Sequence, residues 1–336
     1  MEFLAVAQAF EQIEQVSSRL EMTQQLATLL KQATPVEARL IAYLSLGQMH
    51  APYLEVQFNL ADNNVNKVIA RLLGESEAHV TAAVKKVGDS GLLFEQGSWK
   101  TKEHLTVKEV YKALEHIAQL NGIGSQEEKS NQLEGLLKSL DPLAAKYVVR
   151  IILGKLRLGF SDMTLIDALS WMLAGDKSLR KELEEAYNLC ADIGLITERV
   201  KKDGVSALDT MQITVGVPIR PAAAERLPNA KAIIEKIGPC IAQPKLDGFR
   251  IQIHLDKTGP TPIVRFFSRN LLDMSAMFPD LTQEILKLKV DELICEGEAI
   301  VFNGNTGDFL PFQETVRRKR KHGLSSRQVC ATSYHR

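Results

Sequence analysis

Residues 243–256, Gln-Pro-Lys-Leu-Asp-Gly-Phe-Arg-Ile-Gln-Ile-His-Leu-Asp, decide the fold of the C-terminal part of the chain. From Phe249 to Leu255, apolar residues alternate with polar ones, which is the period of a strand with one buried face. An Asp-Gly turn signal stands directly before this run, and Lys245 precedes the turn. The stretch therefore predicts a strand that begins beside a lysine-bearing loop.

The sequence predicts further strands at 263–267 and 293–302. The preceding two hundred or so residues instead have the spacing and capping signals of helices. Thr34 to Glu37 places a capping hydroxyl, a first-turn proline and a third-position carboxylate in the order that a helix start prefers. Thr106 and Glu109 repeat the capping pattern, and an apolar stripe of helical spacing follows at 143–152.

The pattern changes at residues 204–221, where Pro218 and Pro221 suggest a linker or an extended strand leading into the second domain. We therefore predict an all-α domain at 1–213. It is followed at 214–336 by a partial α/β domain of the α+β kind, built on an antiparallel sheet.

Composition is that of an ordinary globular protein, since 45% of the 336 residues are hydrophobic and 24% are charged. Lys+Arg and Asp+Glu both number 41, so nucleic-acid binding would require a local basic surface. The four cysteines are far apart and form no CxxC pair, which argues against zinc and disulfides. The sequence shows no targeting segment or membrane span, and we expect a cytoplasmic protein.

Lys245 is the candidate nucleophile. A lysine attacks only after losing its proton, which requires partial burial or neighbouring positive charge. Arg250, on the predicted strand, is placed to contact a phosphate. The alternative interpretation is a surface lysine beside an ordinary hairpin turn, and the residues of this stretch alone leave both open.

Residues 243–250 resemble the nucleotide-attachment motif of the covalent nucleotidyltransferases, which are DNA ligases, RNA ligases and mRNA capping enzymes. The resemblance implies that Lys245 attacks the α-phosphate of ATP and carries AMP. It also implies that Asp247, Gly248 and Arg250 complete the motif. Many members have a glutamate where this chain has Gln243, whose amide oxygen can still accept a hydrogen bond from the adenine amino group.

Downstream stretches follow in the order of that family. Arg269, in Ser-Arg-Asn, resembles the ligase arginine that lies near the nucleotide and the nick. Glu298, in Glu-Gly-Glu-Ala, resembles the glutamate that contacts the ribose and helps to place Mg²⁺, although such a stretch alone also fits a solvated hairpin. The basic run 317–321 matches ligases and equally suits a solvated helix face.

The helical part distinguishes the branches of the family. Residues 121–126 put glycines and a hydroxyl at a helix start, a corner that favours anions, and Lys129 follows. A simple helix-turn-helix corner is the alternative. With the basic, glycine-punctuated stretch 150–159, this corner resembles the N-terminal DNA-binding domain of archaeal and eukaryotic-type ATP-dependent DNA ligases. The DNA-contact candidates are Gly122, Gly124, Ser125, Lys129, Arg150, Arg157 and Arg220.

The resemblance implies an ATP-dependent DNA ligase that seals nicks in duplex DNA. Because later family motifs and an OB-fold domain are missing, we expect a truncated chain with little or no ligase activity. Residues 331–336 fit no expected strand. The alternative function is a duplex- or nick-binding module without catalysis. An RNA ligase or capping enzyme would lack the helical domain, and a purely structural protein leaves the ordered motifs unexplained.

Expected partners are ATP, Mg²⁺ and nicked double-stranded DNA, and the chain is expected to be a monomer. A sliding clamp is a further candidate partner, although the sequence shows no docking motif for one. Contacts to DNA should go to the backbone and minor groove, since a ligase must act on any sequence.

Overall fold

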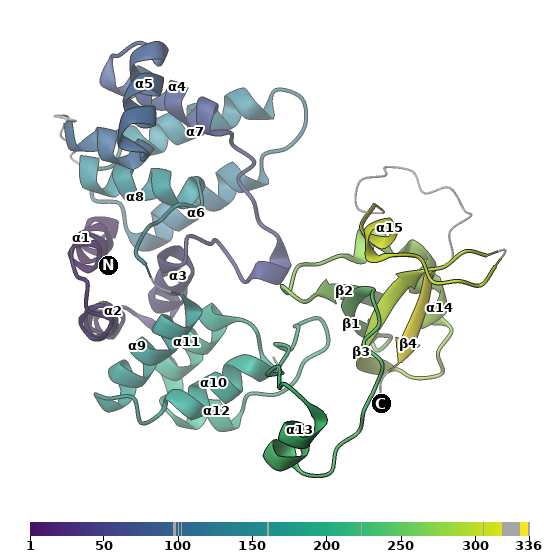
Figure 1. Cartoon of the computed structure of the whole chain (residues 1–336). Helices are drawn as coiled ribbons and strands as arrows, with labels where there is room; N and C mark the ends of the chain where they lie inside the picture. Colours follow the sequence, from purple (N-terminus) through teal and green to yellow (C-terminus); the bar gives the residue numbers. More distant parts are fainter. Residues whose placement is uncertain are drawn as a thin grey trace. The chain divides into compact units, whose positions relative to one another are not determined.

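The computed structural model describes residues 1–96, 99, 101, 103–159, 161–222, 224–304, 306–317 and 330–334. The chain forms two compact units, Met1–Gln212 and Ile213–Arg336, here called the helical unit and the sheet unit (Figure 1). Each unit has its own elements and its own core, and each is described by itself.

The helical unit is built from α-helices and short 3₁₀ turns. In chain order these are α1 (Phe3–Glu14), α2 (Arg19–Gln32), α3 (Pro35–Ser45), η1 (Pro52–Leu54), α4 (Asp62–Leu73), α5 (Glu77–Val87), η2 (Ser90–Gln96), α6 (Val107–Gln119), α7 (Ser125–Lys138), α8 (Pro142–Ile152), α9 (Asp162–Ala174), α10 (Arg180–Leu189), α11 (Ile193–Asp203) and α12 (Ser206–Asp209). None of its described residues belongs to a strand of the sheet. The predicted all-α fold of this part is confirmed.

Local signals explain where these helices begin. Thr34 and Glu37 form a reciprocal capping box at the start of α3, with Pro35 in the first turn. Thr106 and Glu109 form a second capping box at the start of α6. Behind it, α6 buries one face at three- and four-residue spacing, which is the pattern of an amphipathic helix against a core. Both predicted helix starts are confirmed.

The sheet unit contains four described strands and several short helices. These are α13 (Ala230–Ile237), β1 (Phe249–Asp256), β2 (Ile263–Ser268), η3 (Ser275–Met277), α14 (Pro279–Leu286), β3 (Glu292–Val301), α15 (Phe312–Arg317) and β4 (Cys330–Tyr334). The strand order is β2-β1-β3-β4, and every neighbouring pair is antiparallel. The three predicted strands and the antiparallel sheet are confirmed.

One face of this sheet forms the core of the unit. Ile251, Ile253 and Leu255 of β1 are fully buried on it and pack with Phe266 of β2 and Phe278 beside α14. Because side chains alternate along a strand, the intervening residues of β1 lie on the opposite face. That second face carries the polar residues of β1, and the candidate site is built there.

Two details differ from the sequence prediction. Residues 204–221 were predicted as linker or extended chain, but Ser206–Asp209 form the helical turn α12. The sequence predicts no strand at residues 331–336, which is wrong for residues 331–334, since they belong to β4 and pair with β3. The physical reason is that the backbone N–H and C=O groups of β3 need partners on both sides, and a nearby segment can satisfy them whatever its side chains.

Candidate nucleotide and DNA sites

The loop before β1 carries Lys245, whose side chain is exposed. Two hydrogen bonds fix the end of this loop. The Gly248 N–H donates to Glu298 Oε1 on β3 at 3.2 Å, and the Phe312 N–H at the start of α15 reaches Asp247 Oδ2 at 3.5 Å. The lysine therefore stands in an accessible loop whose C-terminal end is tied to two other elements.

Gly248 is required by close packing. A Cβ at this position would lie 2.5 Å from Ile300 Cγ1, 2.6 Å from Glu298 Cγ and 2.9 Å from the Ala299 carbonyl oxygen. Real side chains do not tolerate such distances, so only glycine lets the loop approach β3 this closely. The packing places the chain at Gly248 directly against Glu298.

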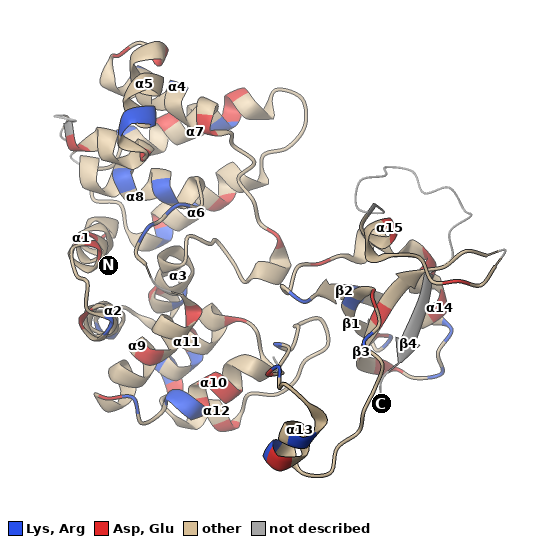
Figure 2. Ribbon diagram, in the orientation of Figure 1, with Lys and Arg blue, Asp and Glu red and all other residues tan. Residues whose placement is uncertain are grey.

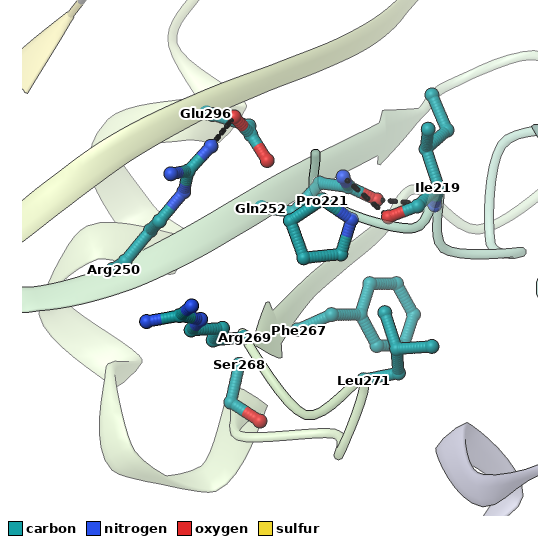
Figure 3. Close-up of a pocket in the computed structure, with 9 residues that line it drawn as sticks. All are labelled: Ile219, Pro221, Arg250, Gln252, Phe267, Ser268, Arg269, Leu271 and Glu296. Carbon is teal, nitrogen blue, oxygen red and sulfur yellow. Dashed lines mark hydrogen bonds and ion pairs between the residues drawn. The ribbon is translucent and has the colours of Figure 1, made fainter. Parts of the chain in front are cut away.

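Arg250 and Glu296 face one another across the two central strands. In the antiparallel register, Arg250 of β1 is opposite Glu298, and Gln252 is opposite Glu296. The Arg250 guanidinium forms an ion pair with the Glu296 carboxylate (Figure 3). Since the two side chains are 46% and 39% exposed, this pair adds little stability, and an incoming phosphate can compete for the arginine.

Arg269, the residue directly after β2, lies close to Arg250 (Figure 3). The turn after β2 is closed by hydrogen bonds from the Leu271 N–H to the Ser268 carbonyl oxygen at 2.8 Å and from the Ser268 N–H to the Leu272 carbonyl oxygen at 2.9 Å. Leu271 takes up a left-handed φ of 63° in this turn. Arg269 is exposed and has no hydrogen bond or ion pair within the described part of the chain.

These residues line one hollow on the polar face of the sheet (Figure 3). Its lining is Ile219, Pro221, Arg250, Gln252, Phe267, Ser268, Arg269, Leu271 and Glu296. Two arginines singled out separately in the sequence are thus brought together. Lys245 and Gln243 are exposed in the preceding loop, outside this lining.

Glu298 was also a candidate metal ligand. Its Oε1 accepts the hydrogen bond from Gly248, so Oε2 is the oxygen left for another partner. Within the described ranges, no three His, Cys, Asp or Glu side chains form a group that could hold a metal. A single carboxylate suits Mg²⁺ that keeps water and substrate phosphates as its other ligands.

In the helical unit, the corner before α7 is exposed. Gly122 and Gly124 have left-handed φ values of 96° and 81°, Ile123 between them is fully exposed, and Ser125 is the first residue of α7. Gly124 caps α7 without a side-chain hydrogen bond. The Ser125 N–H donates to the Gly122 carbonyl oxygen at 3.2 Å, and within the described residues the next two N–H groups, of Gln126 and Glu127, have no acceptor, as an anion site at a helix start requires.

Side chains connect this corner to the start of α4. Gln126 Oε1 accepts from Asn64 Nδ2 at 2.9 Å, and Gln126 Nε2 donates to the Asn59 carbonyl oxygen at 3.0 Å. From the loop after α8, Lys155 Nζ pairs with Asp62 Oδ2 at 2.8 Å. Three loops distant in sequence are thereby joined into one exposed polar surface.

Arg157 lies in that same loop after α8, where apolar and basic residues alternate. Leu156 and Leu158 are buried, whereas Lys155 and Arg157 are exposed. Arg157 has a left-handed φ of 62° and donates to the Gly88 carbonyl oxygen. Its side chain remains 48% exposed, so the guanidinium is accessible to a ligand.

Two candidate DNA contacts require correction, because their side chains are buried. Lys129 is 1% exposed and donates from Nζ to the Phe58 carbonyl oxygen at 2.6 Å. Burial lowers the pKa of Lys129 below its ordinary value. Arg150 is also 1% exposed, and its guanidinium is occupied by Glu14 and Asp89. Neither side chain can contact a phosphate without leaving the core.

Acidic and basic residues are interspersed along the described helices of the helical unit (Figure 2). Arg220, the last candidate contact, belongs to the sheet unit, where it is half-buried directly before Pro221 of the hollow. The basic run 317–321 lies outside the described side chains.

Comparison with known families covers most of the chain. Residues 2–170 match the family described as "DNA ligase N terminus", and residues 221–335 match "ATP dependent DNA ligase domain". This chain belongs to the ATP-dependent DNA ligase family. The second match includes residues 330–334, which form β4.

Curated relatives agree with this assignment. A "Probable DNA ligase" of Dictyoglomus thermophilum is 43% identical over 326 residues, covering 97% of this chain and 55% of the relative. "DNA ligase 2" of Thermofilum pendens is 38% identical and "DNA ligase" of Saccharolobus solfataricus is 35% identical, each covering 96% of this chain, with 55% and 56% of the relative. The chain spans about half the length of these relatives.

Structural similarity adds no further argument. The solved structure named "Pmar-Lig_PreS3" matches 98% of this chain and 56% of its own, at 13% identity and a TM-score of 0.43. No helix in the described ranges has the length and apolar character needed to cross a membrane.

In this ligase-family chain, sequence reasoning missed residues that act through tertiary contacts. Glu296 holds Arg250, Gln252 and His254 bind a backbone segment, and Asn64 joins two exposed corners. The strand alternation put Gln252 and His254 on the face of Arg250, which was the available signal. Their role depends on a segment more than thirty residues earlier, which the local pattern does not reveal.

Proposed function

We propose that this chain carries the nucleotide-attachment and DNA-binding parts of an ATP-dependent DNA ligase. In the first step, Lys245 Nζ attacks the α-phosphorus of ATP. A bond forms between Nζ and phosphorus, the bond from that phosphorus to the bridging oxygen of the β-phosphate breaks, and pyrophosphate leaves. The lysine releases a proton as the nitrogen–phosphorus bond forms.

The later steps use the same phosphorus chemistry. The 5′-phosphate of a nick attacks the lysyl-AMP phosphorus and releases the lysine, and the 3′-hydroxyl then attacks the activated 5′-phosphate and expels AMP. Each step builds negative charge at phosphorus, which fixed positive groups stabilise. Mg²⁺ would supply further charge neutralisation, held by the phosphates and Glu298.

The observation that carries the proposal is the hollow on the sheet face of Arg250. Arg250 and Arg269 lie together there, and the hydrogen bond from Gly248 to Glu298 connects the lysine loop to the same sheet face. We assign phosphate contacts to the two arginines. Gln243 takes the adenine amino group, and Glu298 takes the ribose and the metal.

For DNA, we propose that the exposed corners of the helical unit contact the phosphate backbone. The contacts come from the backbone N–H groups of Gly122 and Gly124, from the Ser125 hydroxyl, and from the side chains of Lys155 and Arg157. Arg220 adds a contact from the sheet unit. These groups recognise shape and charge, so binding should be independent of base sequence.

The adenylation proposal is tested by incubating the chain with α-labelled ATP and Mg²⁺, followed by a denaturing gel. We expect a covalent label that is absent from Lys245→Ala and Lys245→Arg, the latter keeping the positive charge. Lys287→Ala, an exposed lysine on the same unit that pairs with Glu284, is the control and should retain the label. Equal labelling of the parent and Lys245→Arg would refute the assignment.

A second function is a nick-binding module without catalysis. The exposed side chains of Lys155 and Arg157, which do not belong to the lysine loop, support it. In that case nicked duplex binds with strong salt dependence while no label appears on the protein. Label and binding measured on one preparation separate the two functions.

A further inference from the structure

A short segment of the sheet unit is held by side chains from β1. Residues 213–221, here called the strap, precede α13 and carry Ile219 and Pro221 of the hollow. The strap has no ladder with a described strand. Instead, the Gly216 N–H donates to His254 Nδ1 at 2.9 Å, and the Ile219 N–H donates to Gln252 Oε1 at 2.8 Å.

The Gln252 amide pairs with both backbone groups of Ile219. Besides accepting from the Ile219 N–H, it donates from Nε2 to the Ile219 carbonyl oxygen at 3.2 Å (Figure 3). A side-chain amide therefore replaces the partner that a neighbouring strand would provide. Ile219 and its neighbour Arg220 are fixed relative to β1 by this pairing.

His254 completes a chain of hydrogen bonds that is consistent with one protonation state. Because the Gly216 N–H is a donor, His254 Nδ1 must accept, so the proton lies on Nε2. That Nε2 faces Gln252 Oε1 at 2.8 Å and donates to it. The neutral imidazole thereby sets which end of the Gln252 amide faces the Ile219 N–H.

The hydrogen-bonded groups are removed from water. His254 is 1% exposed and Gln252 is 7% exposed, and Phe267, fully buried, packs edge-on against the imidazole with ring centroids 4.9 Å apart. A buried polar group that loses its hydrogen-bond partner lowers the stability of the fold. Breaking one of the four hydrogen bonds therefore weakens the others. Burial, with a smaller contribution from Arg265, lowers the pKa of His254 to about 4.

The charges around His254 come from every neighbouring element. Arg265 of β2 lies directly opposite it, and Ile294 of β3 is its other partner in the sheet. Along the same face, β3 places Glu292 and Glu296, β1 places Arg250 and Asp256, and the strap brings Arg220.

We propose that Gln252 and His254 are positioning residues that hold the strap in place. Through Ile219 and Pro221, the strap forms one wall of the hollow that contains Arg250 and Arg269. The inference rests on the proposed function, because it takes this hollow as the place of the substrate phosphates. Neither residue touches the reacting atoms. They act indirectly, because the strap that they hold forms part of the hollow around Arg250 and Arg269.

The test combines amide exchange with nucleotide kinetics. In Gln252→Ala, hydrogen exchange at the Gly216 and Ile219 amides should be at least ten times faster than in the parent. The ATP concentration for half-maximal labelling of Lys245 should rise at least fivefold. Asp256→Asn, on the same face of β1 but bonded to Thr258, is the control and should match the parent.

Gln252→Glu keeps the shape and tests the hydrogen bonds themselves. At pH 8 its carboxylate has no donor for the Ile219 carbonyl oxygen, so it should behave like Gln252→Ala while the chain stays folded. Parent-like exchange and half-saturation in Gln252→Glu would overturn the inference, as would a freed strap with unchanged half-saturation. If the parent takes no label, the proposed function fails and the positioning role fails with it, whereas a labelled parent with unaffected variants refutes the positioning role alone.

Discussion

Arg150 provides the sharpest test of the structure, because the sequence suggested a DNA contact and the fold places it in the core. Its guanidinium donates to Asp89 Oδ2 from Nε at 3.0 Å and from Nη2 at 2.6 Å. It also donates to Glu14 from Nη1 at 2.7 Å and from Nη2 at 3.0 Å. Arg150→Ala would leave both carboxylates without this partner.

The cost follows from their burial. The Asp89 side chain is 5% exposed and that of Glu14 is 28% exposed. Two longer ion pairs remain as partial substitutes, from Lys146 Nζ to Glu14 at 3.8 Å and from Arg157 Nε to Asp89 at 3.7 Å. Removing one partner of a buried ion pair costs about 3–5 kcal/mol. For a unit of this size, about 1 kcal/mol lowers the melting temperature by roughly 2–4 °C, so a decrease of roughly 6–20 °C is expected.

The pKa of Glu14 points the same way. Burial by itself would raise it, but hydrogen bonds from Arg150 and Tyr147 outweigh burial and hold it below its ordinary value. The carboxylate is therefore stabilised in its charged form by the partner that the substitution removes.

The assay is thermal unfolding followed by circular dichroism, together with binding of labelled nicked duplex at a temperature where every variant is folded. Arg157→Ala is the matched control, since that arginine is half-exposed in the loop after the same helix. We expect the free energy of unfolding of Arg157→Ala to lie within about 1 kcal/mol of that of the parent, and its DNA affinity to be lower. Arg150→Ala should show the opposite pattern. An unchanged melting temperature with weakened DNA binding in Arg150→Ala would refute the burial argument.

Three further predictions follow from single contacts. Gly248→Ala should destabilise the sheet unit by about 1–3 kcal/mol in urea unfolding and abolish Lys245 labelling, because the added Cβ would overlap β3. Gly259→Ala is the control and should have no effect, since the nearest atom to its Cβ would be 4.0 Å away. Equal stability of the two variants would contradict the packing argument. His254 binds a proton in the folded chain only when the pH falls to about 4, whereas the imidazole of the unfolded chain binds one below about 6.5. The neutral imidazole therefore contributes fully to the free energy of unfolding above pH 6.5. About 3 kcal/mol of that free energy is lost as the pH falls from 6.5 through 4. His254→Gln should flatten the rise of unfolding free energy between pH 4 and 6.5, and parallel curves for parent and variant would argue against a neutral buried imidazole. Lys155→Ala should lower the affinity for duplex DNA and reduce the slope of log K against log salt concentration by about 0.9. Its free energy of unfolding should stay within about 0.5 kcal/mol of that of the parent. An unchanged slope would show that Lys155 does not contact a phosphate.

Local patterns were sufficient for the elements themselves. Capping boxes at Thr34 and Thr106 determine where α3 and α6 begin, because the first N–H groups of a helix need acceptors that a nearby side chain provides. The alternation from Phe249 to Leu255 determines β1 and its buried face, because side chains alternate about a strand. Residues 243–250, which resemble a nucleotide-attachment motif, are also recognisable from the sequence, since they are consecutive.

Residue type did not reveal which charged side chains are accessible. Arg150 and Arg157 lie in one stretch and looked equivalent, yet one is enclosed by Glu14 and Asp89 and the other is half-exposed. The difference arises from α1 and η2, which pack on α8 from far along the chain. Lys129 was misplaced for the same reason, since Phe58 supplies its acceptor.

The starts of α3 and α6, the strands β1 to β3 and the lysine motif could thus be read from the sequence, because helix caps, strand period and a contiguous motif depend on neighbours in the chain, whereas β4 and the helical turn α12 could not. Only the tertiary structure decided that Arg250 and Arg269 share a hollow, that Gln252 and His254 hold the strap, and that Arg150 belongs to the core. Each of these depends on desolvation and on partners distant in sequence. A side chain's burial is set by what packs over it, and that is a property of the whole fold.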